Sequence, residues 1–361
     1  PLSLLGSLLC IGAFWAKSRV FETFADTQGY YLYHFYFFEE RELAFFLWFC
    51  ATLLPAALLM ARFLEGVARG DLLARLLTGS EISDARFAWL LAGVAVALAT
   101  TQALVTLELS PITDDERVYR FMAQLLLQGR AQYPTPSEEL FPFLFKAFMN
   151  FEHGRWTAIY LWGHPAFLAP GEAVGFPQLM NLLSAGVSVL CTFHIARTLF
   201  DSLTARVAGV LMVLSPLFIF SASTMLSQPS GAMFLAVGGL AYVKLLRGAG
   251  RGRGWALLCG LALSWAFYCR PASAALIGFI CAHGAVCLVT SRGRLLLRAW
   301  PMVIGAAIPI VVFGGINLSL DGHLLMPMRS HDSPDTPGLG IGTVVGGVRF
   351  GPLLAVSNVA D

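Results

Sequence analysis

The stretch SPITDDERVYRFMAQLLLQG, residues 110–129, lies where a long apolar run of the chain gives way to polar sequence. Three consecutive acids, Asp114, Asp115 and Glu116, come first. The apolar side chains after them recur at helical spacing: Val118, Phe121, Met122, Leu125 and Leu126. The stretch predicts a short amphipathic helix that begins where a membrane span ends, and the acids at its start need an explanation.

The composition indicates an integral membrane protein. Of 361 residues, 57% are hydrophobic and only 13% are charged, whereas a soluble domain carries about 25% charged residues. The net charge of +2 gives no reason to expect a nucleic-acid partner. The seven cysteines lie in or beside apolar runs without metal-ligand spacing. Asp115, Glu116 and His164 could hold a divalent ion, but no ligand spacing supports one, so no metal or other cofactor is predicted.

Apolar runs long enough to cross a bilayer, which takes about 20 residues, predict an all-α fold with about nine transmembrane helices. The candidate spans are 2–16, 44–63, 87–107, 174–197, 206–224, 229–246, 255–270, 271–290 and 300–317. In the apolar run from 255 to 290 the only break is the tripeptide CRP at 269–271. Arg270 would be costly inside lipid and Pro271 ends a helix, so two spans are expected to meet there.

Basic residues in alternate loops predict the orientation of the spans, because such loops stay in the cytoplasm. The acids, the long loop 108–173 and Arg270 then face the extracytoplasmic side. We predict three parts. They are residues 1–86, with two extra spans and a cytoplasmic loop, a transmembrane core at 87–317, and an extracytoplasmic tail at 318–361. Whether the protein continues beyond this tail stays open.

The loop 108–173 is too long to be a simple connection. Besides the acid-led helix it contains SEELFPFLFKAFMNF, residues 137–151, a second amphipathic stretch rich in Phe. Helices of this kind lie in the membrane interface.

The three acids allow two interpretations. An acid at a helix start is favoured by capping and by the helix dipole, but one acid would be enough for that. A partly desolvated carboxylate at the interface has a raised pKa and can serve as a general base. Asp115 and Glu116 point about 100° apart on a helix, so they need not act on the same atom.

Two further residues could carry chemistry. His164 lies in YLWGHPAFLAPGEAVG, residues 160–175, whose Gly and Pro residues predict a turn-rich connection to the next span. It is either a hydrogen-bonded structural residue or part of a site. Arg270 is either an anchor at a span end or a cation for a lipid phosphate, which its planar guanidinium can bind.

These segments together resemble a known family. The sequence DDERVYRFMAQLLLQG followed by YPTP resembles the first large loop of GT-C membrane glycosyltransferases. It is most similar to the branch that holds protein O-mannosyltransferases and the aminoarabinose transferase of lipid A. The resemblance covers about 87–330 and continues through 154–175, 205–230, 260–276 and 317–327. Leu161 and Trp162 stand where bacterial members usually have prolines.

The resemblance implies an enzyme that moves a sugar from a polyprenyl-phosphate donor to an acceptor on the extracytoplasmic side. The acceptor, whether protein, lipid or glycan, stays open. The implied general base is Asp115, with Glu116 and Asp114 as alternatives. The donor phosphate would contact Arg270, Arg155 or Lys146, and His164 and Tyr119 are substrate-site candidates. The implied location is a bacterial inner membrane, with the site facing the periplasm.

Two rival functions remain. A non-catalytic membrane subunit could keep the GT-C-like fold without activity. A multispan transporter is disfavoured, because transporters place ionisable residues inside their spans and these spans are nearly free of charge.

Overall fold

The computed structural model describes residues 5–13, single positions between 51 and 62, and then 82–137, 148–150, 154–248, 252–290 and 296–320, with two short strands beyond. The chain divides into two compact units, one of residues 1–81 and 332–361, the other of residues 82–331. The predicted domain limits at 86/87 and 317/318 stay predictions.

In the first unit, residues 5–13 are helical. The strands β4 (Val344–Val345) and β5 (Val348–Arg349) pair antiparallel. Most of the predicted span 2–16 is described and helical, whereas most of 44–63 lies outside the described residues.

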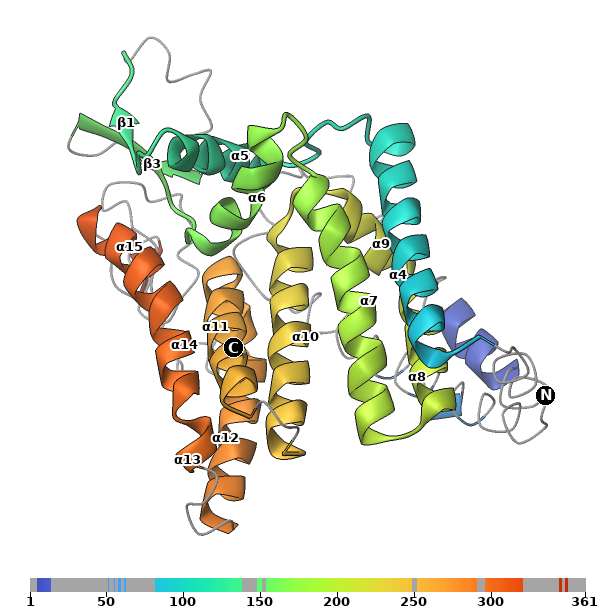
Figure 1. Cartoon of the computed structure of the whole chain (residues 1–361). Helices are drawn as coiled ribbons and strands as arrows, with labels where there is room; N and C mark the ends of the chain where they lie inside the picture. Colours follow the sequence, from blue (N-terminus) through green and yellow to red (C-terminus); the bar gives the residue numbers. More distant parts are fainter. Residues whose placement is uncertain are drawn as a thin grey trace. The chain divides into compact units, whose positions relative to one another are not determined.

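The second unit is mostly helical, and every candidate site residue that the structure describes belongs to it (Figure 1). Five of its described helical segments are long and apolar enough to cross a membrane, or six if the bent pair α8 and α9 is one span. The prediction of nine spans is therefore not confirmed. The long segments are α4 (Asp84–Thr101) with η1 (Gln102–Thr106), α7 (Leu179–Leu199), α10 (Ser227–Leu246), η5 (Pro271–Ser273) with α12 (Ala274–Thr290), and α14 (Pro301–Pro309) with η6 (Ile310–Gly314) and α15 (Gly315–Ser319). The others are α8 (Ser202–Val213), α9 (Pro216–Ser223), α11 (Gly252–Cys269) and the short α13 (Leu296–Ala299).

All seven predicted spans from 87 to 317 coincide with helices, but one of them is broken. The predicted span 206–224 bends by 58° between α8 and α9. Ser215 caps the second helix by accepting a hydrogen bond from the Phe218 amide, and Pro216 occupies its first turn. Proline lacks an N–H and fits the first turn of a helix, so α8 ends here and α9 starts in a new direction.

The helices pack side by side (Figure 1). At some crossings their backbones come very close. The helix α10 lies between α7 and α11, and α11 lies between α10 and α14. A Cβ atom on Gly260 would lie 1.9 Å from the Met302 carbonyl oxygen, and one on Gly305 would lie 2.0 Å from the Leu257 carbonyl oxygen. Small residues of this kind let membrane helices approach until their backbones touch.

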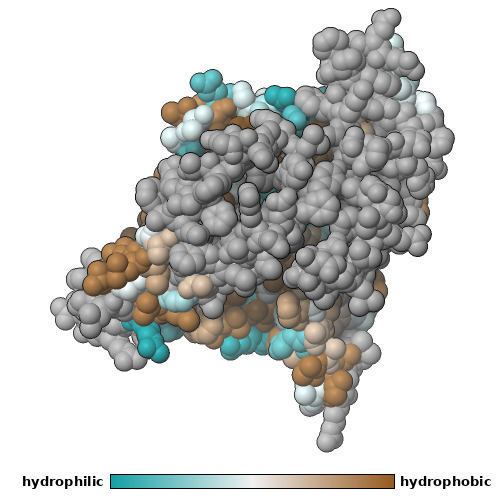
Figure 2. Space-filling model, turned by 180° about the vertical axis from the view of Figure 1, so that it is seen from behind, coloured by the Kyte–Doolittle hydropathy of each residue, from teal (hydrophilic) through white to brown (hydrophobic). Residues whose placement is uncertain are grey.

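Large hydrophobic side chains are exposed along these helices, as lipid-facing surfaces require. Trp89, Leu217 and Val303 are each about two-thirds exposed or more. Brown, hydrophobic residues are visible on the part of the rear face that is not grey (Figure 2). None of the residues of α12, all of which the structure describes, is buried. This helix therefore makes most of its contacts outside the protein.

Between α4 and α7 the chain builds α5 (Asp114–Leu127), three short strands and α6 (Gly163–Ala173). The strands β1 (Tyr133–Pro134), β3 (Arg155–Ala158) and β2 (Met149–Asn150) form an antiparallel sheet in that order. The purely all-α prediction was wrong here, because two-residue pairings leave no period in the sequence. Most of the predicted amphipathic stretch 137–151 lies outside the described residues, and its described end, Met149–Asn150, forms β2.

The prediction of a turn-rich connection at 160–175 was wrong, since most of it forms α6. Pro165 lies in the first turn of α6, where a missing N–H costs nothing. Gly163 is needed for a close approach, because a Cβ atom there would lie 2.5 Å from the Tyr268 carbonyl carbon of α11. The Trp265 indole N–H also donates to the Gly163 carbonyl oxygen at 2.9 Å.

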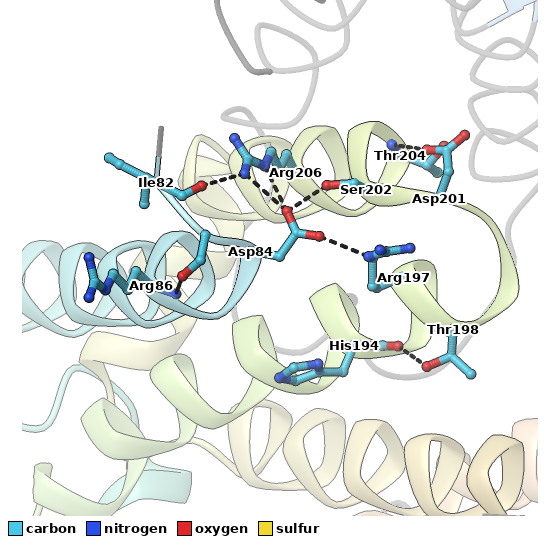
Figure 3. Close-up of polar contacts among 11 residues, drawn as sticks. Ile82, Asp84, Arg86, His194, Arg197, Thr198, Asp201, Ser202, Thr204 and Arg206 are labelled. Carbon is cyan, nitrogen blue, oxygen red and sulfur yellow. Dashed lines mark hydrogen bonds and ion pairs between the residues drawn. The ribbon is translucent and has the colours of Figure 1, made fainter. Parts of the chain in front are cut away.

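The helix ends form two polar groups. The start of α4 meets the end of α7 and the start of α8, where Asp84 binds Arg197 and Arg206 (Figure 3). At the other end of α4, the Leu109 carbonyl accepts a hydrogen bond from Gln178, just before α7. The loops predicted to be cytoplasmic and those predicted to be extracytoplasmic thus meet at opposite ends of α4 and α7.

Candidate active site

The helix α5 starts at Asp114 as predicted, and it is capped by the residue before the acids. The Thr113 hydroxyl accepts a hydrogen bond from the Glu116 amide at 3.4 Å. Its apolar stripe is buried, with Val118, Met122 and Leu125 fully enclosed. Since Thr113 provides the cap, none of the three acids is needed for it.

The three acids have different surroundings. Asp114 is exposed and pairs with Arg117 at 3.4 Å. Asp115 is half-buried, and its Oδ1 atom accepts a hydrogen bond from the Tyr160 hydroxyl at 2.6 Å. Glu116 is buried, with 1% exposure. A helix turn thus distributes three adjacent carboxylates between solvent, an interior edge and the core.

Glu116 is bound by uncharged donors. Its Oε2 atom accepts from the Met225 amide at 3.1 Å, and its Oε1 atom accepts from the Thr113 hydroxyl at 3.3 Å. Burial raises the pKa of Glu116, and these hydrogen bonds partly oppose the rise. The carboxylate joins the start of α5 to the turn between α9 and α10.

Two tyrosines, the buried Tyr119 and the half-buried Tyr160, lie near Asp115. The rings of Tyr119 and Tyr160 lie 4.8 Å apart, and the Tyr119 hydroxyl donates to Ser227 Oγ at 3.3 Å. The pKa of Tyr119 is raised to about 12, mainly by burial; the hydrogen bond with Ser227 and the charge of Arg270 lower it, and the charge of Asp115 raises it. Burial and donation to Asp115 also raise the pKa of Tyr160. Of the two tyrosines, Tyr160 is the one that contacts Asp115 directly.

Arg270 lies at the junction of α11 and η5, as predicted from the CRP break. Its backbone is extended, with φ −154°, and its side chain is exposed. Its Cβ atom lies next to the second turn of α10, where a Cβ atom on Gly231 would be 3.5 Å away. This contact fixes the base of the arginine side chain against α10.

His164 is fully buried in the first turn of α6. Its Nε2 atom lies 2.8 Å from the Met225 carbonyl oxygen, and its Nδ1 atom lies 2.8 Å from Ser230 Oγ. A carbonyl only accepts, so Nε2 carries the proton. Burial lowers the pKa of His164 to about 4, so the ring is neutral at neutral pH, with its proton on Nε2.

The other candidates are dispersed. Tyr119 is buried beside His164, with the two rings 4.6 Å apart and edge to face. Arg155 lies in β3, opposite Pro134 of β1. Lys146 falls outside the described residues. Within the described ranges no three His, Cys, Asp or Glu side chains form a group that could hold a metal ion.

Sequence reasoning missed two features of the site. The first is Tyr160, the hydrogen-bond donor to Asp115, although it begins the quoted segment 160–175. The second is an ion pair in which Arg120 contacts both carboxylate oxygens of Glu172 at 3.1 and 3.0 Å, with Gln124 donating to the same carboxylate at 2.6 Å. Arg120 and Gln124 lie at i and i+4 on the polar face of α5, which was the available signal.

Comparison with known proteins gives one match. Residues 173–316, from the end of α6 to α15, match the sequence profile of the dolichyl-phosphate-mannose-protein mannosyltransferase family. The matched stretch includes Arg270 but begins after the three acids in the chain. No curated protein and no solved structure matches the chain. Over residues 173–316 the chain is thus similar to the dolichyl-phosphate-mannose-protein mannosyltransferases, GT-C membrane glycosyltransferases that use a polyprenyl-phosphate-linked sugar.

Proposed function

We propose that Asp115 is the general base of a sugar transfer from a polyprenyl-phosphate donor to an acceptor hydroxyl. The observation that carries this is the half-buried carboxylate of Asp115 on α5, held by Tyr160. The helix α5 contacts the start of α10 through Tyr119 and Ser227, and Arg270 lies beside the next turn of α10. A base and a cation are thereby brought to one end of the helices.

The environments of the acids favour Asp115 over its neighbours. A general base must come within about 2.6–3.2 Å of the proton it removes. Both oxygens of Glu116 are engaged in the core, and Asp114 is exposed beside Arg117. Tyr160 binds Oδ1 of Asp115, while no described residue donates to Oδ2. That second oxygen is the one we assign to the acceptor.

The proposed reaction is a direct displacement. The acceptor hydroxyl gives its proton to Asp115, and its oxygen forms a bond to the anomeric carbon of the sugar. The bond from that carbon to the phosphate oxygen breaks, and polyprenyl phosphate leaves with the bonding electrons. Arg270 stabilises the charge on the departing phosphate, and the anomeric configuration inverts.

We further propose that this end faces away from the cytoplasm. Arg197, in the last turn of α7, and Arg206, near the start of α8, lie at the other end of these helices, and basic residues near span ends mark the cytoplasmic side. In a bacterial inner membrane, the site would face the periplasm. The donor's phosphate at the outer interface would then lie level with Arg270, while its chain stays in lipid.

The test of the base is Asp115→Asn, with Asp114→Asn as matched control. Release of polyprenyl phosphate from polyprenyl-phosphate mannose is measured in membranes of producing cells, which contain the natural acceptors. Loss of a general base should lower turnover about 100-fold or more, while Asp114→Asn stays near the parent. Full activity of Asp115→Asn would overturn the assignment. A parent chain that releases no polyprenyl phosphate would favour the non-catalytic alternative.

The test of the cation is donor binding by Arg270→Ala and Arg270→Lys, with Arg130→Ala as control for loss of a positive charge. Contacts between a charged donor and phosphate contribute about 1.5–3 kcal/mol, so Arg270→Ala should weaken binding roughly ten- to hundredfold. Lysine cannot reproduce the planar two-point contact and should restore only part of it. Parent-like binding by Arg270→Ala would reduce Arg270 to an anchor.

A further inference from the structure

The turn between α9 and α10, residues 224–226, is held by buried side chains from three different helices. Glu116 of α5 accepts from the Met225 amide at 3.1 Å. His164 of α6 donates to the Met225 carbonyl oxygen at 2.8 Å. Asn181 of α7 donates to the carbonyl oxygens on either side, those of residues 224 and 226, at 2.8 Å each. Four backbone groups of one turn are thus satisfied from outside it.

These contacts decide where the turn lies. Glu116, His164 and Asn181 are at most 1% exposed, so water cannot replace them. Buried backbone groups almost always have a partner, since leaving one unpaired is costly. The turn can therefore adopt only the position in which all three side chains reach it.

The same turn lies between the proposed base and the proposed phosphate ligand. Glu116 is adjacent in sequence to Asp115. On the other side, α10 starts directly after the turn, His164 also reaches Ser230, and the Arg270 side chain packs against Gly231. A shift of the turn would move the start of α10, and Arg270 with it, relative to Asp115.

We propose that Glu116 and His164 are positioning residues, which act through Met225 to fix the separation of Asp115 and Arg270. This rests on the function proposed above. Neither side chain touches the reacting atoms. Glu116 is required as a hydrogen-bond acceptor and His164 as a hydrogen-bond donor to one peptide unit.

A positioning residue and a general base tolerate different substitutions. Glutamine at 116 keeps a carbonyl oxygen for the Met225 amide, and its amide N–H₂ can donate to the Thr113 hydroxyl. Glutamine at 164 keeps an N–H donor for the Met225 carbonyl. A general base, by contrast, does not survive conversion of a carboxylate to an amide.

The experiment compares Glu116→Gln and Glu116→Ala with Asp115→Asn in the full chain, by release of polyprenyl phosphate from polyprenyl-phosphate mannose. Activity is expressed per folded molecule, measured by size-exclusion chromatography in detergent. Glu116→Gln should stay within about threefold of the parent. Glu116→Ala should lose roughly 10- to 100-fold, as expected when reacting groups are displaced by about 1 Å. Inactivity of Glu116→Gln beside an inactive Asp115→Asn would overturn the inference, whereas an active Asp115→Asn would overturn the proposed base.

His164 is tested in the same assay with His164→Gln, His164→Leu and the control His194→Leu, a half-buried histidine of α7 at the opposite end. His164→Leu should lower kcat roughly tenfold or more per folded molecule, with the acid limb of the pH profile unchanged, and His164→Gln should recover most of the loss. His194→Leu should behave as the parent. Equal kcat per folded molecule in His164→Leu and the parent would show that the residue only supports folding, and would overturn its positioning role.

Discussion

The two ends of the helical unit each contain a carboxylate that joins several helices, but the two carboxylates are bound by different kinds of donor. At one end, Asp84 is bound by Arg197 at 2.8 Å and by Arg206 at 3.0 Å, with Ser202 as a third donor (Figure 3). At the other, Glu116 is bound by the Met225 amide and the Thr113 hydroxyl. The first group uses cations, and the second uses uncharged donors.

The difference follows from what lies next to each carboxylate. Asp84 has no chemical task in the proposed mechanism, so arginines can pair with it and hold the helices. Glu116 is next to Asp115. An arginine bound to Glu116 would also attract Asp115 and compete with the acceptor for it. Uncharged donors fasten the helix start and leave the neighbouring carboxylate available.

The largest effect on stability is expected from removal of Asn181, an uncharged donor to the turn between α9 and α10. Asn181→Ala leaves two buried carbonyl oxygens of the α9–α10 turn without their donor, at about 2 kcal/mol each, so the free energy of unfolding should fall by about 4 kcal/mol. Ser188→Ala is the control, because that buried hydroxyl has no partner among the described residues. Denaturant unfolding in detergent measures both. A loss below about 1 kcal/mol for Asn181→Ala would contradict the importance of the turn.

His164 and Glu116 should make the free energy of unfolding depend on pH in opposite directions. The pKa of His164 falls from 6.5 in the unfolded chain to about 4 in the folded one. Between these values the unfolded state binds more protons, so stability rises with pH and is lost as pH falls towards 4. The contribution is about 3 kcal/mol, at 1.36 kcal/mol per pH unit.

In His164→Gln this rise between pH 4 and 6.5 should disappear. Glu116 works in the opposite sense, because its raised pKa gives stability at low pH that is lost as pH rises through the folded value. Glu116→Gln should therefore steepen the rise that His164→Gln removes. Parallel unfolding curves for parent and His164→Gln across this range would exclude a neutral buried histidine.

A smaller effect is expected at the charged end. Asp84→Asn keeps an oxygen for hydrogen bonds but leaves the buried Arg206 without a counter-charge, although the Ile82 carbonyl still accepts from it at 2.7 Å. Because Asp84 is 27% exposed, solvent offsets part of the loss, and we expect a cost of about 1–2 kcal/mol. Thermal unfolding at low and high salt measures it. A cost as large as that of Asn181→Ala would remove the distinction between the two ends.

The smallest effect should come from Arg197, the half-exposed partner of Asp84. Its side chain is 48% exposed, and ion pairs in such positions contribute less than about 1 kcal/mol. Arg197→Ala should therefore lower the unfolding temperature only slightly, and added salt should reduce the difference further. A marked loss that persists in high salt would mean that Arg197, rather than Arg206, holds this end together.

The sequence was sufficient to predict the long helices between 87 and 317 and the start of α5, since both depend on local patterns. The apolar stripe of α5 and the CRP break before α12 each express a preference that a few neighbouring residues decide. The sheet of β1, β2 and β3 left no such trace, because its pairings involve two residues at a time and depend on contacts across the loop.

The roles of the individual acids could not be predicted in the same way. Asp115 and Glu116 are equivalent in a sequence, and what separates them is a contact between Glu116 and Met225, 109 positions further along the chain. The donor to Asp115, Tyr160, is likewise 45 positions away. Local reasoning found the cluster, and only the fold distinguishes its members.

The exposed character of α12 has a consequence for how the enzyme should respond to its membrane. With η5 it forms a candidate span of 20 residues, about 30 Å long, which equals the thickness of an ordinary hydrocarbon core. None of the residues of α12 is buried, and α12 contacts its neighbours through side chains such as Ile277 and His283, whereas α11 lies between α10 and α14. A change in bilayer thickness should therefore act more directly on α12 than on α11. Arg270 is the joint between the two helices, so acyl-chain length should tune donor use without altering any residue of the site.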